Sequence, residues 1–178
     1  MQLTKGRPID CNNRLEKEQR VYELLDKLNI EYYYVDHEPL MTMEACKGVD
    51  GVLESVVCKN IFLCNRQMTD FYLLMMPGDK KFVTKDVSKQ LGCARLSFAN
   101  EDKLLEYLDL TPGSVSVLGL MNDKNNNVKL VIDADILNGE YIGMHPCINT
   151  SSLKIKIDDL LNKFLNEINH DYIIINMD

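Results

Sequence analysis

Two apolar runs separated by a short polar stretch constrain the fold of this chain more than any other feature. The first run extends from Val56 to Cys64 and the second from Phe71 to Met76, and both have the composition of buried strands. The six residues between them, 65–70, are polar, so we predict an antiparallel hairpin. The chain is therefore expected to fold around buried β-structure.

Lys59 interrupts the first run with a charge. Because side chains alternate along a strand, Lys59 shares a face with Ile61 and Leu63, whereas Asn60 shares the opposite face with Phe62. An ammonium that is buried without a partner is costly or loses its proton, so Lys59 would have to meet a polar cleft or an anion. The alternative is a strand end, where the stem covers apolar surface and the head reaches water. Taken alone, the residue favours the strand end.

The remaining pattern predicts short helices and strands that alternate without a regular βαβ order, which indicates one mixed α/β domain over residues 1–178. Residues 1–12 are expected to form a flexible N-terminal extension. Helices are predicted over 13–29, from a cap at Thr42 to Gly48 with a loop through Gly51, and over 86–91, 100–108 and 158–169. Further strands are predicted over 32–35, 94–98, 128–133, 140–144, 153–157 and 172–175.

Composition and charge exclude several classes of protein. No apolar stretch is long enough to cross a bilayer and no signal peptide is evident, so the expected location is cytoplasmic, with no membrane partner. The six cysteines and three histidines lack zinc-site spacing, and we expect reduced cysteines, no metal and no cofactor. The net charge of −7 argues against broad binding to nucleic acid, DNA included. A local basic segment remains at Lys80, Lys81, Lys85, Lys89, Arg95 and Lys103.

A second informative segment, residues 143–150, places polar groups and backbone breakers between two predicted strands. In a functional interpretation, His145 and Asn149 face a ligand and Gly143 allows close approach of the backbone. In a structural interpretation, the same two side chains hydrogen-bond the backbone of an ordinary turn. The segment alone does not decide between them.

Together, several short motifs resemble the YbaK/ProX family of aminoacyl-tRNA deacylases from about the first helix to the last. They are Lys59-Asn60, Gly78-Asp79-Lys80-Lys81, Pro112-Gly113-Ser114-Val115, and His145-Pro146 with Asn149. The segment 37–45 is most similar to the free-standing, alanine-specific editing proteins, which hydrolyse alanine mischarged on proline tRNA. The resemblance implies a YbaK-type fold, a largely antiparallel, barrel-like curved sheet surrounded by helices.

The resemblance also implies which residues form the site. It implies Lys59 as the functional centre, with Asn60 and His145 as further catalytic residues, because ester hydrolysis needs charge stabilisation and a positioned water. The implied partner is the acceptor end of mischarged tRNA(Pro), with prolyl-tRNA synthetase as a further candidate. The implied substrate-binding residues are Thr42, Gly113, Ser114, Val115, Ser116, Gly143, Pro146 and Asn149.

The implied pocket must admit alanine and reject proline. A synthetase for proline excludes the smaller alanine poorly, since lost apolar contacts are worth only about 1–3 kcal/mol. A narrow apolar pocket would provide the second selection step, and Met43, Ile61 and Leu120 are candidates to line it, or else plain core. The sequence departs from the family at Val117, where proline is common, and this change bears on the rigidity of the loop and on acyl-group selection.

Three alternatives remain open. A different small amino acid, chiefly cysteine, serine, threonine or 2-aminobutyrate, would keep the deacylase chemistry. A thiol hydrolase would use Cys147 beside His145 as nucleophile and base, although no orienting acid is evident. A regulatory module would bind an aminoacyl-tRNA or a synthetase without catalysis.

Overall fold

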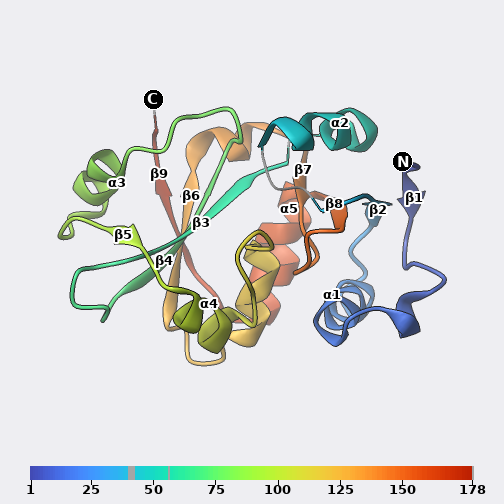
Figure 1. Ribbon diagram of the computed structural model, residues 1–178, viewed down its shortest axis with the longest axis horizontal. Helices are drawn as coiled ribbons and strands as arrows, with labels where there is room; N and C mark the ends of the chain where they lie inside the picture. Colours follow the sequence, from blue (N-terminus) through green and yellow to red (C-terminus); the bar gives the residue numbers. More distant parts are fainter. Residues whose placement is uncertain (40–42, 56, 178) are drawn as a thin grey trace.

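The computed structural model describes residues 1–39, 43–55 and 57–177, and within α2 it leaves the side chains of residues 43–47 undescribed. The described strands form two sheets (Figure 1). The first is antiparallel, in the order β1 (Thr4–Lys5), β2 (Tyr32–Asp36), β8 (Ser151–Lys156) and β7 (Tyr141–Met144). The second has the order β5 (Ser97–Phe98), β3 (Lys59–Cys64), β4 (Phe71–Met76), β6 (Val128–Asp133) and β9 (Tyr172–Ile175).

The second sheet is mixed. The strand β3 is antiparallel to both β4 and β5, while β4, β6 and β9 run parallel to one another. The predicted hairpin is confirmed, with Lys59 opposite Met76 and Cys64 opposite Phe71. The expected barrel-like curved sheet is not confirmed, because the described strands separate into two sheets rather than closing into one barrel.

Helices cover the sheets on several sides. They are α1 (Glu16–Lys27), α2 (Met43–Leu53), α3 (Thr84–Leu91), α4 (Glu101–Leu108), and a continuous helical segment made of α5 (Ile157–Asp159), the π-helical η4 (Leu160–Phe164) and α6 (Leu165–Glu167). The described residues also form the 3₁₀ turns η1 (Cys11–Asn13), η2 (Val117–Asn122) and η3 (Ala134–Asn138). None of the helices in the described ranges combines the length and apolar character needed to cross a membrane.

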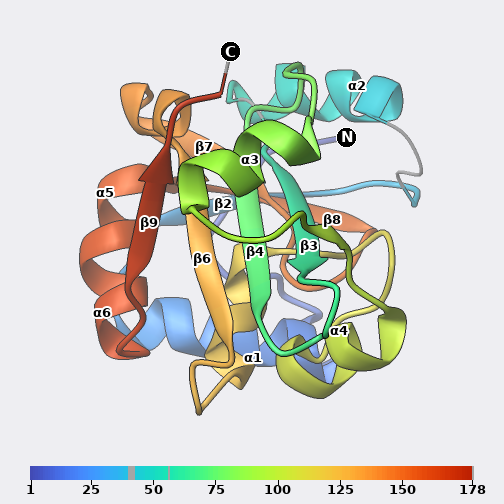
Figure 2. The same ribbon diagram turned by 90° about the vertical axis from the view of Figure 1, so that its left-hand side faces the viewer.

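The alternation predicted for β3 is confirmed by two separate core clusters. Ile61 and Leu63 belong to the cluster beneath α3, which lies across one face of the five-stranded sheet (Figure 2). Phe62 and Cys64 belong to the larger cluster on the other face, which we call the main core and which also contains side chains of α1, α4 and α6. The charge-bearing face and the main-core face of β3 are therefore distinct.

The predicted end of α2 at Gly48 is wrong, because the helix continues through Gly48 and Gly51 to Leu53. Val49 and Leu53 are fully buried and pack with Val35 and Val57. A glycine inside a helix costs only about 1 kcal/mol relative to alanine, and burial of two aliphatic side chains offsets that cost. The predicted cap at Thr42 lies outside the described residues.

The two sheets meet at one point that matters for the site. Val57 forms a parallel bridge with Gly143, and the Cys58 amide donates to the Gly143 carbonyl at 2.9 Å. A Cβ atom on Gly143 would lie 2.9 Å from Val57 Cγ2 and 3.0 Å from Val57 Cα, so only glycine lets the two backbones approach this closely. The bridge therefore brings the start of β3 to the end of β7.

Candidate active site

Lys59 is the first residue of β3 and is half-buried. Its Nζ donates to the backbone carbonyl of Lys80 at 3.0 Å, across the hairpin that pairs Lys59 with Met76. This arrangement combines the two explanations considered for the residue, since Lys59 lies at a strand end and its ammonium also has a polar partner. An ammonium has three N–H donors, so one bond to a carbonyl leaves donors for a substrate oxygen.

Asn60 points to the opposite face of β3, beside the thiol of Cys58. Its amide lies 3.2 Å from Cys58 Sγ, and its Oδ1 is buried and has no hydrogen-bond partner within the described residues. The two ends of an amide are assigned from their neighbours, and either orientation here leaves one polar end of Asn60 unbonded. An unbonded buried amide is costly, so the position is suited to a ligand or a water.

His145 follows β7 and is held in one tautomer. Its Nδ1 lies 3.0 Å from the carbonyl oxygen of Ser151, which can only accept, so Nδ1 carries the proton and Nε2 presents a lone pair. Burial lowers the pKa of His145 below its ordinary value, and the nearby His37 lowers it further, against an opposing effect of the Ser151 carbonyl. The ring is therefore a neutral acceptor near pH 7.

His37 is a neighbour of His145 for which the sequence suggested no role. The two rings meet edge to face with centroids 6.2 Å apart. His37 is fixed at both nitrogens, by Glu38 O and by Ser152 Oγ, each at 2.8 Å. The pairing of β2 with β8 brings the two histidines close together, and no local sequence pattern predicts that pairing.

The implied substrate loop lies against the His145 segment. Ser116 is fully buried and donates to the His145 carbonyl at 2.6 Å, and Gly113, with φ of 86°, runs beside the Asn149 amide. Ser114 instead bonds back to Thr111 O at 2.9 Å and so stabilises its own turn. Further along the two segments, Val115 packs on the main core and Pro146 is buried.

The bridge between the sheets relates the two halves of the candidate site. Lys59 and His145 each follow the Val57–Gly143 bridge by two residues, so the lysine and the histidine are placed near one junction. Thr42 lies outside the described residues, and the side chain of Met43 is likewise undescribed. Ile61 and Leu120 are buried and lie in different core clusters, which agrees with the alternative that they are plain core.

Cys147 does not have the properties of a nucleophile. Its side chain is fully buried, and burial raises the pKa of the thiol to about 12. A thiol in that state is almost entirely protonated near pH 7 and reacts poorly. The geometry therefore disfavours the thiol-hydrolase alternative.

The family model of the aminoacyl-tRNA editing domain matches residues 37–163 of this chain. That range includes Lys59, the Gly113 loop and His145. The chain belongs to this family. It is 32% identical over 146 residues to the prolyl-tRNA editing protein ProX of Acetoanaerobium sticklandii, covering 82% of this chain and 89% of that protein. The expected membership of the YbaK/ProX family is thus confirmed, and with it the expectation of a deacylase enzyme.

Other proteins are similar to this chain over nearly its whole length. Prolyl-tRNA synthetase associated domain-containing protein 1 of Danio rerio is 32% identical over 173 residues, covering 96% of this chain and 90% of that protein. The solved structure of a proposed trans-editing enzyme for prolyl tRNA synthetase superimposes with a TM-score of 0.67 at 13% identity, covering 92% of this chain and 97% of that one. At that identity the structural likeness supports the fold alone.

The tautomer and burial of His145 lead to a measurable expectation. We expect its ring to titrate below pH 6.5 in the folded protein, because burial disfavours the imidazolium. Between that lower pKa and 6.5 the unfolded chain binds the proton more readily, so this residue makes stability decrease as pH falls through that window. Proton NMR of the ring, with His145→Gln to assign the resonance, measures it. Titration at or above pH 6.5 would contradict the proposed environment.

Proposed function

We infer that this enzyme is a trans-editing deacylase that removes alanine mischarged on tRNA(Pro). The observation that carries the proposal is the bridge between Val57 and Gly143, which lies two residues before both Lys59 and His145 and so places an ammonium and a neutral histidine acceptor near one point of an editing domain. Its similarity to the ProX protein and to the proteins associated with prolyl-tRNA synthetase supports tRNA(Pro) as the substrate and a synthetase as a candidate partner. A role in translation is consistent with a cytoplasmic location.

The chemistry follows from the two side chains. Water attacks the ester carbonyl carbon, a negative charge develops on the carbonyl oxygen, and the bond to the ribose 3′ oxygen breaks as that oxygen takes a proton. The N–H donors of Lys59 would stabilise the developing oxyanion. His145 Nε2 would accept a hydrogen bond from the attacking water or the vicinal ribose hydroxyl, and thereby orient it.

The choice of amino acid is the finer part of the proposal. A comparison of alanyl-, cysteinyl- and seryl-tRNA(Pro) as substrates tests it, and we expect alanyl-tRNA(Pro) to be hydrolysed fastest. Faster hydrolysis of the cysteinyl or seryl ester would assign the enzyme to another small amino acid. Binding of all three without hydrolysis of any would favour the regulatory alternative.

A basic and aromatic cleft offers a contact for the acceptor arm. The cleft has a volume of about 730 Å³, and its lining includes Arg66, Arg95 and Phe98. Phe98 is 70% exposed, and its ring meets that of Phe82 edge to face with the two ring centroids 5.7 Å apart. A second aromatic side chain therefore supports the exposed ring. The cleft adjoins the Cys64 end of β3, about 17 Å along the strand from Lys59. A few nucleotides of single strand can span such a distance.

The basic segment of the sequence contributes to this region only in part. Lys80 faces Asp133 and Asp135, and Lys103 pairs with Glu106, so these two cations have acidic partners within the protein. Arg95 is exposed beside the aromatic cleft. Arginine and an exposed ring together favour single-stranded nucleic acid, since phosphate pairing and base stacking then act side by side.

Removing the stacking ring should weaken use of the tRNA. We expect Phe98→Ala to lower kcat/KM for alanyl-tRNA(Pro) about tenfold, mainly through KM, because one base stack is worth about 1–3 kcal/mol. Arg95→Ala should lower kcat/KM too and reduce its salt dependence, since one phosphate contact is lost. Tyr172→Ala, which removes a ring that is 39% exposed on β9, is the matched control. Equal values for Phe98→Ala and Tyr172→Ala would place the tRNA elsewhere.

A further inference from the structure

The side chain of Lys80, a residue of the turn between β4 and α3, binds two carboxylates and a backbone carbonyl. Its Nζ lies 3.0 and 3.2 Å from the two oxygens of Asp133 and 2.8 Å from Asp135, and it also donates to the backbone carbonyl of Met177. The carboxylate of Asp133 is almost wholly buried, with 1% of its side chain exposed. One side chain thus joins the β4–α3 turn to the end of β6 and to the segment that follows β9.

The backbone of the same residue holds the candidate catalytic lysine. The Lys80 carbonyl accepts the bond from Lys59 Nζ, and the Lys80 amide closes the turn by donating to Pro77 O at 3.3 Å. Lys59 is therefore fixed at its backbone by pairing with β4 and at its tip by a carbonyl. The side chain of the residue that supplies this carbonyl, Lys80, is itself bound to β6 and to the C-terminal segment.

We propose that Lys80 is a positioning residue for Lys59, which acts by holding the carbonyl that orients the Lys59 ammonium. The inference rests on the proposed function, in which Lys59 stabilises the oxyanion. The ammonium of a lysine ends a flexible four-carbon stem, so it needs an outside contact to hold it in one orientation. A misplacement of about 1 Å at a reacting centre can lower the rate about a hundredfold. The salt bridge of Lys80 to a buried carboxylate supplies the rigidity that Lys59 lacks.

The sequence provides a matched control beside it. Lys81 is the next residue, carries the same charge and is exposed, and no ion pair is found for it among the described residues. A role for Lys80 in attracting tRNA by its charge would be shared by Lys81. A role in positioning would belong to Lys80 alone, and would be recovered by arginine, which can also bind the Asp133 carboxylate.

The test compares Lys80→Met, Lys80→Arg and Lys81→Met with the wild-type protein, using alanyl-tRNA(Pro) under steady-state conditions. We expect Lys80→Met to lower kcat about tenfold while KM changes less than twofold, in keeping with a loss of orientation rather than of binding. Lys80→Arg should retain most of the wild-type kcat, and Lys81→Met all of it. A folded Lys80→Met protein with the wild-type kcat would overturn the proposal.

A second measurement reads the position of Lys59 without deacylation. In Lys80→Met, the Lys59 amine should react faster with acetic anhydride than in Lys81→Met, as measured by mass spectrometry of the Lys59 peptide. If Lys80→Met does not fold, Asp133→Asn replaces it. The Oδ1 atom of the asparagine can still accept from the backbone N–H of Asp135, whereas the ion pair between Lys80 and position 133 is lost and the one with Asp135 remains. If the wild-type protein has no deacylase activity, the proposed function is wrong. The labelling of Lys59 does not depend on that activity, so it would still test whether Lys80 positions Lys59. Unchanged labelling of Lys59 would overturn it.

Discussion

Replacing Lys59 by alanine is expected to slow the hydrolysis of alanyl-tRNA(Pro) by about 10²–10³-fold, the usual cost of removing one donor that stabilises an oxyanion. The side chain is half-buried at the start of β3 and its ammonium has a polar partner in the Lys80 carbonyl, so the charge is held at a defined position. The loss should appear in kcat, because the interaction forms mainly as charge develops on the carbonyl oxygen. Single-turnover deacylation with enzyme in excess measures this chemical step directly.

Two controls distinguish catalysis from folding and from general charge. Lys59→Met keeps an apolar stem over the sheet and should fold like the wild type, as judged by thermal unfolding, while remaining as inactive as Lys59→Ala. Lys81→Ala removes an equal charge from the exposed neighbouring turn and should leave the rate unchanged. If Lys59→Ala and Lys81→Ala were equally active, Lys59 could not be the residue that stabilises the transition state.

The fold could be predicted where the local pattern and the tertiary structure agree. The hairpin of β3 and β4 follows from short-range chemistry and is confirmed. The helices predicted over 86–91 and 100–108 are confirmed as α3 and α4, and short-range chemistry ends the first at Gly92, which is left-handed, and begins the second at Asn100, whose side chain accepts from the Lys103 amide. The end of α2 could not be predicted, because burial of Leu53 against Val57 offsets the glycine signals. Strand 94–98 shortens to Ser97–Phe98, because β5 pairs with β3 only at Leu63 and Cys64.

The site shows the same division. Lys59 is conspicuous in the sequence because a charge in an apolar strand is unusual, and His145 because it lies in a loop rich in polar residues and backbone breakers. Their surroundings involve backbone carbonyls, those of Lys80 and Ser151, which carry no signal in the sequence. His37 is missed for a related reason, since only the pairing of β2 with β8 brings its ring to His145.

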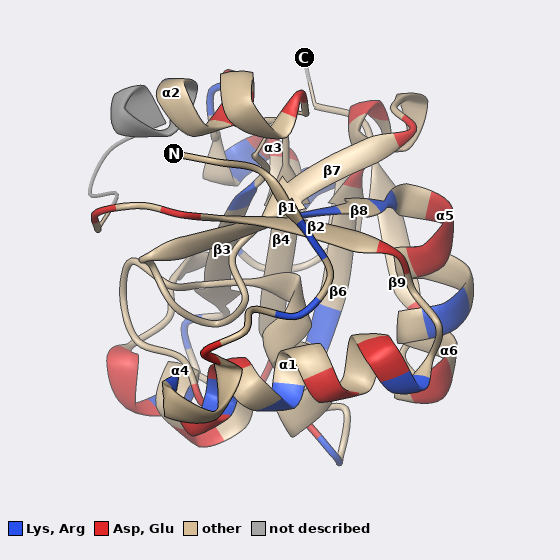
Figure 3. Cartoon of the chain, turned by 90° about the vertical axis from the view of Figure 1, so that its right-hand side faces the viewer, with Lys and Arg blue, Asp and Glu red and all other residues tan. Residues whose placement is uncertain are grey.

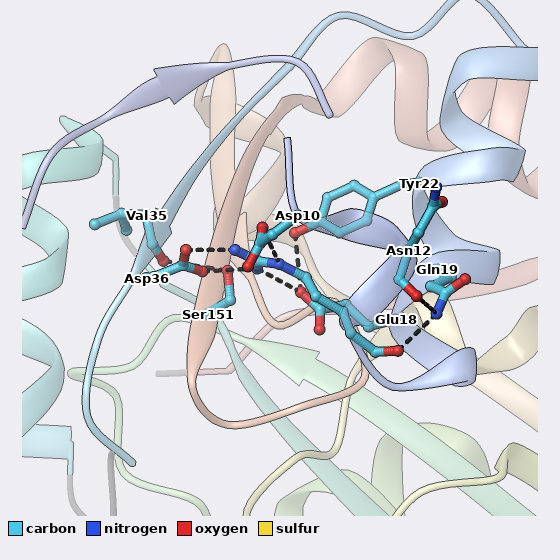
Figure 4. A network of polar contacts seen from close by, with 9 residues as sticks. Asp10, Asn12, Glu18, Gln19, Tyr22, Val35, Asp36 and Ser151 are labelled. Carbon is cyan, nitrogen blue, oxygen red and sulfur yellow. Dashed lines mark hydrogen bonds and ion pairs between the residues drawn. The ribbon is translucent and has the colours of Figure 1, made fainter. Parts of the chain in front are cut away.

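The support for His145 extends to a charged network at the N-terminal side of the protein. Ser151, whose carbonyl accepts from His145, also donates through its Oγ to Val35 O at 3.2 Å. Beside it, Arg14 donates through Nη2 to Asp36 Oδ2 at 2.6 Å and through Nη1 to Glu18 Oε1 at 2.8 Å, within the network drawn in Figure 4. Acidic and basic residues are interspersed along α1 (Figure 3), and Glu18 is the acidic residue of that helix that turns inward, with 2% exposure.

The Arg14 side chain therefore balances a carboxylate that is not accessible to water. Burial raises the pKa of Glu18 above its ordinary value even though the Arg14 hydrogen bond and charge oppose that shift. The Tyr22 hydroxyl, itself fully buried, donates to the same carboxylate at 3.2 Å. Removing the guanidinium would leave a buried negative charge with one neutral donor, which is among the most destabilising changes that a single substitution makes.

We expect Arg14→Met to lower the free energy of unfolding at pH 7 by about 3 kcal/mol, at the lower end of the range for breaking a buried ion pair. The lower end applies because Asp36 and Asp10 are 48% and 61% exposed and can be solvated once the arginine is gone. Urea unfolding measures the change. The double variant Arg14→Met/Glu18→Gln should recover about 1–2 kcal/mol of it, because the unpaired charge is removed with its partner.

The pH dependence of the single variant provides the sharper test. Without Arg14, the folded protein should bind a proton at Glu18 well above the pKa of about 4.3 that a glutamate has in an unfolded chain. The folded state then holds more protons than the unfolded state in that window, so the variant should become more stable as the pH falls from 7 toward 5, whereas the double variant should lack this gain. A single variant whose stability is independent of pH over that range would mean that water reaches Glu18, and that the burial of this carboxylate does not depend on Arg14.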